Sequence, residues 1–110
     1  MTSIREIVES PIEQGTDEIF AYRFNTTNAQ GGGTTTVTSP AVVKVYDITD
    51  GAYTDVTTTV MPTNSPSIAT VYITTSPLKL MTVDHTYRME IQFIISGNTY
   101  ERYLIVECKQ

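Results

Sequence analysis

The feature that most constrains the fold is an alternation of apolar and polar residues near the C-terminus. From Tyr87 to Ile95 every second side chain is apolar, and Arg88, Glu90 and Gln92 occupy positions between them. Successive side chains of a β-strand point to opposite faces, so this pattern predicts a half-buried strand. The apolar spacing of three and four residues that an amphipathic helix requires is almost absent from the chain.

The pair Gly97-Asn98 predicts a tight turn after this strand. Glycine suits the positive φ at the first central position of a type II′ turn, so the chain is expected to return as an antiparallel partner. This turn places Arg88 opposite Glu107 on the polar side of the hairpin. On the other side apolar residues are predicted to meet: Ile95 with Tyr100, Ile91 with Leu104, Met89 with Val106, and Tyr87 with Cys108.

Further short strands are predicted upstream. Asp50-Gly51 indicates a type I′ turn between two strand-like runs, with Ile48 opposite Tyr53 and Val45 opposite Val56. Residues 19–24 read as a strand covered on both sides, and residues 67–74 as one more strand. Residues 1–12 are expected to be an edge strand or a flexible arm, and the Gly- and Thr-rich residues 25–36 a mobile loop.

These elements predict the fold class. With 110 residues, the chain has room for one domain, residues 1–110, with a single core. About seven short strands with turn signals every 8 to 12 residues describe an immunoglobulin-like antiparallel β-sandwich, and a barrel is the alternative.

Charge and composition exclude several functions. The net charge is −5 and the 7 Lys and Arg residues form no basic run, which argues against a nucleic-acid partner. No apolar stretch approaches the ~18 residues needed to cross a membrane, and no export signal is visible at the start. The one cysteine, Cys108, cannot form an internal disulfide, which fits synthesis in a reducing cytoplasm. Its place in the predicted hairpin makes it a buried small residue rather than a reactive thiol.

Tyr87 and its neighbours Asp84 and His85 pose a choice between a structural corner and a catalytic site. In immunoglobulin-like sandwiches a Tyr at the start of the penultimate strand packs into the core and turns its hydroxyl onto the backbone a few residues upstream. Tyr87 has that position, and Leu78, Leu80 and Val83 are expected to close the end of the sandwich. Asp84 and His85 are adjacent and diverge, so we interpret them as an exposed turn.

Other clusters of chemically capable residues also have simpler interpretations. Asp47, Asp50 and Asp55 lack the spacing and the late Glu of a calcium loop, so a hairpin turn is favoured over a weak cation site. The acidic cluster at positions 13, 17 and 18 is interpreted as solvated, and the glycines at 31–33 lack the Lys-Ser/Thr of a phosphate loop. We therefore predict no catalytic, cofactor-binding or metal-binding residues. Tyr53 and Tyr103 are the tyrosines that remain candidates for surface contacts, and cross-strand packing is the simpler interpretation of each.

The order of several segments resembles the small immunoglobulin-like proteins encoded among the head and tail genes of tailed phages and prophages. These segments are PIEQGTDE, AYRF, VYDITDGAYTDVT, MPTNSPSI, LKLMTVDHTYRMEIQF and GNTYE. The chain lacks the cysteine pair and the core Trp of antibody domains. The resemblance implies a non-enzymatic virion structural or assembly protein that binds other virion proteins, acts in several copies as a homo-oligomer and is made in the bacterial cytoplasm. A carbohydrate-binding or surface-adhesion module is the alternative.

Overall fold

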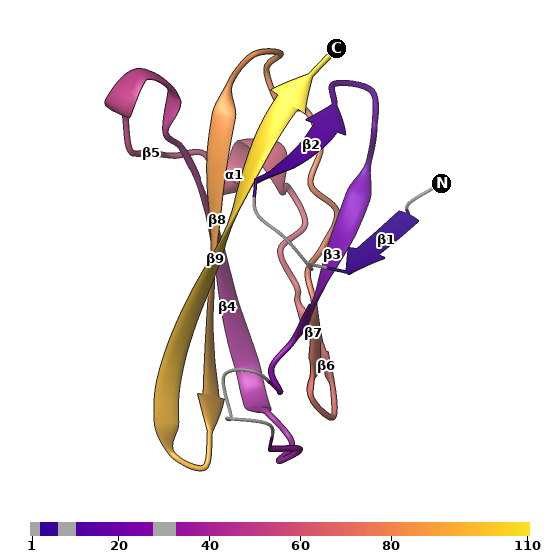
Figure 1. Cartoon of the computed structure of the whole chain (residues 1–110), viewed down its shortest axis with the longest axis vertical. Coiled ribbons are helices and arrows are strands. Elements are labelled where there is room, and N and C mark those ends of the chain that lie inside the picture. The colour runs from indigo at the N-terminus through magenta and orange to yellow at the C-terminus, as the bar shows by residue number, and fades with distance from the viewer. Residues whose placement is uncertain (1–2, 7–10, 28–32) are drawn as a thin grey trace.

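Two β-sheets pack face to face in the computed structural model, which describes residues 3–6, 11–27 and 33–110 (Figure 1). This confirms the predicted all-β sandwich. The described residues form nine strands rather than about seven. The two additional strands come from a segment near the N-terminus and from the division of one predicted strand into two.

The larger sheet has five strands in the order β2-β9-β8-β4-β5. β4, β8 and β9 are its long strands, and β5 pairs with only the last two residues of β4. β2 pairs with β9 in parallel, while the other neighbours are antiparallel. The bounds are β2 (Ile12–Gly15), β9 (Asn98–Lys109), β8 (Thr86–Ile95), β4 (Thr38–Asp47) and β5 (Thr54–Asp55).

The smaller sheet has four strands in the order β1-β3-β7-β6. β1 (Ser3–Glu6) is an edge strand and pairs in parallel with β3 (Phe20–Asn25). The prediction of one strand over residues 67–74 was wrong, because β6 (Ser67–Ala69) and β7 (Tyr72–Thr74) form a hairpin. Thr70, with φ of 57°, lies in the two-residue turn that reverses the chain.

The C-terminal hairpin is present, but its predicted register was wrong. Tyr87 lies opposite Val106 and Met89 opposite Leu104, two positions from the predicted partners. Ser96 and Gly97 both have positive φ, so the turn is of type I′ and Gly97 occupies its second central position. A turn moved by one residue shifts the pairing by two, an even number, and every side chain therefore keeps its predicted face.

The second predicted hairpin has the expected turn and register. Asp50 and Gly51 have positive φ, and Ala52 donates its backbone N–H to the carbonyl of Thr49. Tyr46 lies opposite Asp55, which is the predicted register. The second strand is shorter than expected: β5 ends at Asp55 and is followed by one helical turn, α1 (Thr57–Val60). A 3₁₀ segment, η1 (Thr49–Gly51), includes the turn itself.

The predicted mobile loop at residues 25–36 falls partly outside the described residues, which omit 28–32. Thr26 is buried and donates its backbone N–H to the carbonyl of Val71 (2.8 Å). On the other side Val37 is buried and donates to the carbonyl of Thr70 (3.0 Å). Both flanks of the loop are therefore fixed to the turn between β6 and β7.

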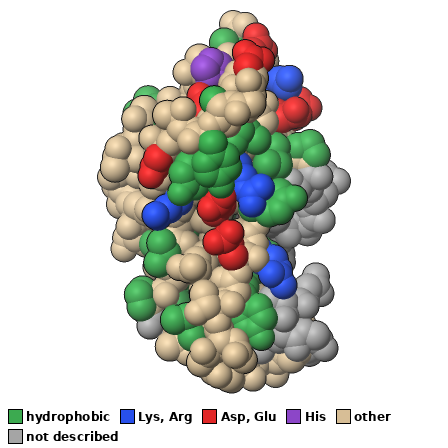
Figure 2. Space-filling view, turned by 90° about the vertical axis from the view of Figure 1, so that its left-hand side faces the viewer, with side chains coloured by type: hydrophobic (Ala, Val, Ile, Leu, Met, Phe, Trp, Pro, Cys, Tyr) green, Lys and Arg blue, Asp and Glu red, His purple; other side chains and the backbone are tan. Residues whose placement is uncertain are grey.

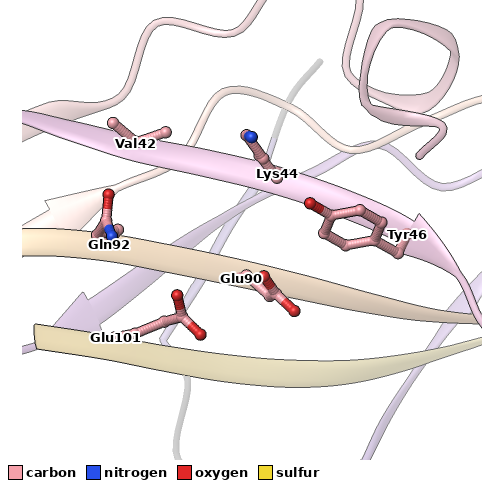
Figure 3. A pocket seen from close by; sticks show the side chains of 6 residues that line it. All are labelled: Val42, Lys44, Tyr46, Glu90, Gln92 and Glu101. Carbon is pink, nitrogen blue, oxygen red and sulfur yellow. The ribbon is translucent and has the colours of Figure 1, made fainter. Parts of the chain in front are cut away.

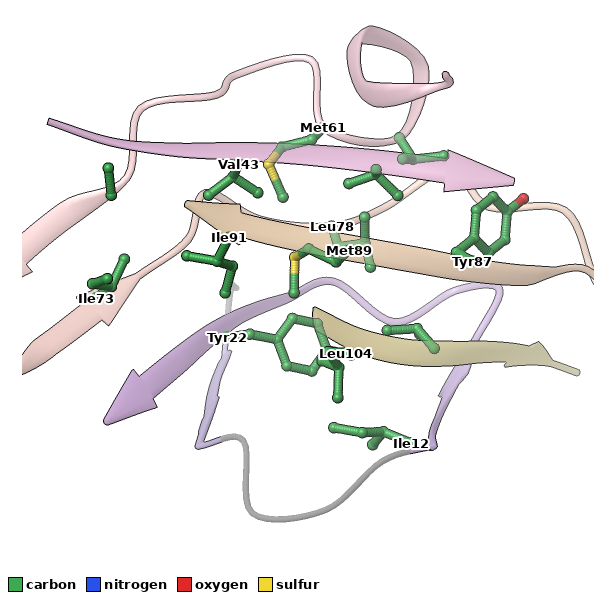
Figure 4. Close-up of a cluster of buried hydrophobic side chains, with 14 of the residues drawn as sticks. Ile12, Tyr22, Val43, Met61, Ile73, Leu78, Tyr87, Met89, Ile91 and Leu104 are labelled. Atoms are coloured by element: carbon green, nitrogen blue, oxygen red, sulfur yellow. The ribbon is translucent and has the colours of Figure 1, made fainter. Parts of the chain in front are cut away.

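The core lies between the two sheets (Figure 4). Of the three residues expected to close its end, Leu78 is fully buried and Val83 half-buried, but Leu80 is exposed. Leu80 has φ of 58°, which breaks the local alternation, and Met81 is buried instead. The buried cluster includes Ile12, Tyr22, Val43, Met61, Ile73, Leu78, Tyr87, Met89, Ile91 and Leu104.

A buried polar junction joins the sheets near β2. Gln14 on β2 is fully buried, and its side-chain carbonyl accepts a hydrogen bond from the hydroxyl of Tyr22 on β3 (2.6 Å). Its amide nitrogen donates to the backbone carbonyls of Glu18 and Leu78, both at 2.8 Å. These bonds satisfy both ends of the Gln14 amide, so the group is accommodated without the cost of an unpaired buried polar atom.

Candidate functional site

Tyr87 has the structural role predicted for it. Its side chain is buried, and its hydroxyl accepts a hydrogen bond from the backbone N–H of Thr82 (2.8 Å). The bond holds the crossover before β8 against the start of that strand. Tyr87 therefore serves the fold as a tyrosine corner.

Asp84 and His85 were predicted not to orient each other, and they do not. His85 instead has an acidic partner elsewhere in the chain. Its Nδ1 lies 2.6 Å from Oδ2 of Asp47, at the end of β4. Asp84 is exposed and has φ of 68°. The His85–Asp47 contact joins residues 38 positions apart, and the order of residues gave no sign of it.

Asp47 is the centre of a small hydrogen-bond network. It accepts bonds from the backbone N–H (3.0 Å) and the hydroxyl of Thr49, and the Thr49 hydroxyl oxygen accepts from the N–H of Thr86 (3.0 Å). Partial burial works to raise the pKa of Asp47, but the bonds from Thr49 and His85 outweigh it and the pKa is lowered.

This network contains the acid and the histidine of a catalytic triad, Asp47 and His85, but no nucleophile bonded to the histidine. The Thr49 hydroxyl donates to Asp47 rather than to His85, so His85 does not activate it. Nucleophilic catalysis requires the base to be hydrogen-bonded to the nucleophile. The network instead ties η1 to the start of β8.

The three acids weighed as a calcium loop are also engaged separately. Asp55 accepts from the backbone N–H (3.0 Å) and hydroxyl (2.7 Å) of Thr57, and these bonds lower its pKa. Asp50 is exposed in the turn, and Asp47 binds Thr49 and His85. Within the described part of the chain no three His, Cys, Asp or Glu side chains gather in a group able to hold a metal ion.

The remaining candidates have local roles. Glu13, Asp17 and Glu18 are all exposed, and Glu18 accepts a hydrogen bond from the backbone N–H of Gly15 (2.7 Å). Cys108 is fully buried, and this burial, with a smaller contribution from the charge of Asp84, raises the pKa of its thiol. Cys108 is therefore protected from reaction, although its partner across the hairpin is not Tyr87.

The most distinctive surface is the side of the five-stranded sheet that faces away from the core. We call this the outer face and define it by the outward side chains of β4, β8 and β9, together with Tyr53, which packs on Tyr46. Figure 2 shows hydrophobic, acidic and basic side chains gathered together on this side of the molecule. The central residues of the outer face are Val42, Lys44, Tyr46, Tyr53, Arg88, Glu90, Gln92, Glu101 and Tyr103.

Exposed apolar groups are concentrated on the outer face. Tyr53 is 57% exposed, Tyr103 54% and Val42 43%, and these are three of the five large hydrophobic residues that are exposed in the described chain. Tyr53 and Tyr103 are thus exposed, and each ring also packs on a neighbouring side chain, so both interpretations of these tyrosines apply in part. Scattered exposed apolar residues are ordinary, but an apolar group rimmed by charges is typical of a contact surface.

Glu90 organises one part of the outer face. Its carboxylate accepts a hydrogen bond from the hydroxyl of Tyr53 and another from Nε of Arg88 (2.9 Å). The bond to Glu90 raises the pKa of the Tyr53 phenol. Tyr53 also stacks on Tyr46, with ring centroids 4.4 Å apart, and the Arg88 guanidinium lies over the ring of Tyr103 at 3.9 Å. These contacts fix the aromatic rings before any partner binds.

A shallow hollow of about 120 Å³ lies in the middle of the outer face (Figure 3). Lys44 on β4 and Glu101 on β9 line it on either side of β8, and Gln92 and Glu90 form its centre. Both Lys44 and Glu101 are exposed, and neither forms an ion pair within the described residues. The hollow thus presents a cation and an anion that form no ion pair among the described residues, although the charge of Lys44 also helps to lower the pKa of Asp55.

Sequence reasoning identified two tyrosines of the outer face and missed its charged centre. The alternation along β8 does predict that Arg88, Glu90 and Gln92 point away from the core, but the neighbouring strands supply Lys44 and Glu101 through long-range pairing.

Comparisons with known proteins add no assignment: no family model matches the chain, and no curated protein matches it. The described residues include no helix with the length and apolar character of a membrane span.

Proposed function

We propose that this protein is a non-enzymatic structural or assembly component of a phage or prophage virion, and that it acts by binding other virion proteins through the outer face. The observation that carries the proposal is the composition of that face. Tyr and Arg are among the residues most enriched at the energetic centres of protein interfaces, and here Tyr53, Arg88 and Tyr103 are exposed or half-exposed on one side of the five-stranded sheet.

The resemblance to small immunoglobulin-like phage proteins supports the virion setting. A β-sandwich with short edges suits such a lattice component, because weak contacts repeated over many copies gain strength through avidity. The edge strands β1, β2, β5 and β6 contain two to four residues each, which limits uncontrolled pairing through sheet edges.

The absence of catalysis is part of this proposal. His85 is oriented by Asp47, yet no hydroxyl or thiol of the described residues is bonded to its ring. The polar groups of the network are used to hold η1 and β8 together. We therefore assign function to contact surfaces rather than to chemistry.

A carbohydrate-binding module is the second candidate, and the exposed Tyr53 and Tyr103 beside carboxylate and amide groups favour it. Saccharides stack on free aromatic faces and hydrogen-bond to such groups. However, one face of Tyr53 is covered by Tyr46, and Arg88 covers one face of Tyr103. For this reason we propose protein binding ahead of saccharide binding.

The test is mass spectrometry of purified phage particles, combined with affinity capture by the tagged chain. We expect the chain, or its complex with identified capsid, portal or tail proteins, to be detected. Tyr103→Ala should weaken that capture, whereas the control Asp17→Ala should not. A chain that is absent from particles and assembly intermediates, and that binds a defined saccharide through Tyr103, would overturn the proposal in favour of the second candidate.

A further inference from the structure

We infer that the outer face binds a second copy of this chain, forming a twofold symmetric dimer through the hollow over β8. This inference rests on the proposed function, because it adds a second copy of this chain to the partners of the outer face, and the two kinds of partner then compete for that face. It also makes a claim that is testable with the purified chain alone.

Charge complementarity is the main reason for choosing a second copy. In a symmetric dimer, if residue i of one copy contacts residue j of the other, then j also contacts i. Lys44 and Glu101 are opposite in charge, exposed, and free of ion pairs within the described residues. One symmetric contact would therefore satisfy four charges at once, two from each copy.

The positions of these residues fit the symmetry. Lys44 lies beside Glu90 on β8, and Glu101 lies beside Gln92 on the same strand, so the two charges are on opposite sides of β8 (Figure 3). A twofold axis parallel to the sheet that passes over β8 between Glu90 and Gln92 exchanges them. Lys44 of each copy then meets Glu101 of the other.

The distribution of net charge favours this face over the rest of the surface. The charged side chains of the outer face are Lys44, Arg88 and Lys109 together with Glu90, Glu101 and Glu107, and these three positive and three negative charges cancel. The whole net charge of −5 consequently lies elsewhere on the chain. Two copies repel each other through most orientations and do not repel through the outer face, which supplies specificity as well as attraction.

Apolar contacts complete the surface. Val42, Tyr53 and Tyr103 are exposed around the hollow, and their burial between two copies removes apolar area from water. Tyr53 and Tyr103 are already held by Tyr46 and Arg88, so little side-chain freedom is lost on association.

The experiment is sedimentation equilibrium of the full chain over a concentration series, with charge reversals on the outer face. The wild-type protein should show a monomer–dimer equilibrium. Lys44→Glu and Glu101→Lys should each weaken dimerisation by at least about tenfold, because each places like charges together twice. The double variant should recover most of the wild-type association. Lys79→Glu, in the segment between β7 and β8, and Asp17→Lys make the same charge changes outside the outer face and should leave the equilibrium unchanged.

Each alternative outcome overturns the inference in a recognisable way. A monomeric wild-type chain at concentrations up to about 1 mM contradicts the dimer. Dimerisation that is equally affected by the control variants contradicts the assignment to the outer face, and loss without recovery in the double variant contradicts the Lys44–Glu101 pairing. In each of these three cases the proposed function stands as long as the chain still captures virion proteins. If the chain dimerises but captures no virion protein, only the proposed function is refuted.

Discussion

The inner and outer faces of the five-stranded sheet are made by alternate residues of the same strands, yet their interactions differ. On the inner face Val45, Met89 and Leu104 are fully buried against the other sheet. On the outer face Lys44, Glu101 and Tyr103 are exposed, and two of these three carry charges without ion pairs among the described residues. The inner face therefore stabilises the fold through buried apolar contacts, whereas the outer face keeps exposed aromatic and charged groups that a partner can contact.

The largest effect on stability is expected from the polar junction of the interior. Gln14→Ala removes a buried side chain together with its hydrogen bonds to the Tyr22 hydroxyl and the Leu78 carbonyl. The free energy of unfolding should fall by roughly 3 kcal/mol, from the cavity combined with the lost buried hydrogen bonds. Urea denaturation measures it, and Asp17→Ala, at an exposed position on the turn after β2, should stay within about 0.5 kcal/mol. Equal effects of the two variants would remove the distinction between interior and surface.

The second-largest loss of stability is expected at the end of the hydrophobic core, where Tyr87 lies. Tyr87→Phe keeps the buried ring and removes the acceptor of the Thr82 N–H, so the free energy of unfolding should fall by about 1 kcal/mol. Tyr100→Phe is the matched control, since the Tyr100 hydroxyl has no hydrogen bond among the described residues. Thermal unfolding of both variants checks this, and a larger loss for Tyr100→Phe would contradict the corner.

A smaller effect, with a defined pH dependence, is expected at the network between β4 and β8. The pKa of Asp47 in the folded protein lies below its ordinary value of 3.8. The ionised carboxylate therefore stabilises the fold fully above that value, and this stabilisation is lost as the pH falls through the lowered folded pKa. Asp47→Asn should cost about 1 kcal/mol at pH 7 and less at pH 3.

Denaturation of this variant at pH 7, 5 and 3 provides the measurement. Asp50→Asn is the control, because Asp50 is exposed in the adjacent turn. A destabilisation by Asp47→Asn that is the same at all three pH values would show that the charge of Asp47 makes no contribution.

The smallest effect on stability is expected on the outer face. Tyr103→Ala loses the contact with the Arg88 guanidinium, and an exposed cation–π pair of this kind contributes about 0.5 kcal/mol. Its binding to the partner should fall by about tenfold or more, because exposed aromatic anchors dominate interface energies. Calorimetric titration against the captured virion protein, together with urea denaturation, separates the two quantities. A variant that loses stability and keeps its affinity would reverse the roles of the two faces.

Local patterns predicted the strands and their faces, because alternation over residues 87–95 and the glycine turns act within a few residues. The register of the C-terminal hairpin was not predictable to the same degree. It depends on whether Ser96 or Asn98 joins Gly97 in the turn, and Ser96 adopts the positive φ that the turn requires. Leu80 was misplaced for a similar reason, since its backbone conformation overrides the alternation.

The candidate site was less predictable than the fold. Tyr53 and Tyr103 were identified from residue type alone, whereas the pairing of β4 and β9 on either side of β8 brings Lys44 and Glu101 to one hollow. The contacts of His85 with Asp47 and of Gln14 with Leu78 likewise join distant segments. Such contacts follow from tertiary packing and leave no periodic signal in the sequence.

Carboxylate footprinting shows whether the outer face becomes buried when the protein assembles. The free chain and the chain in assembled particles are labelled with a carbodiimide, and the modified residues are quantified by mass spectrometry. If the outer face is the contact surface, Glu101 should be strongly protected in the assembly, while the exposed Asp17 and Glu13 should be labelled as in the free chain. Unchanged labelling of Glu101, with protection confined to Asp17 or Glu13, would contradict the account.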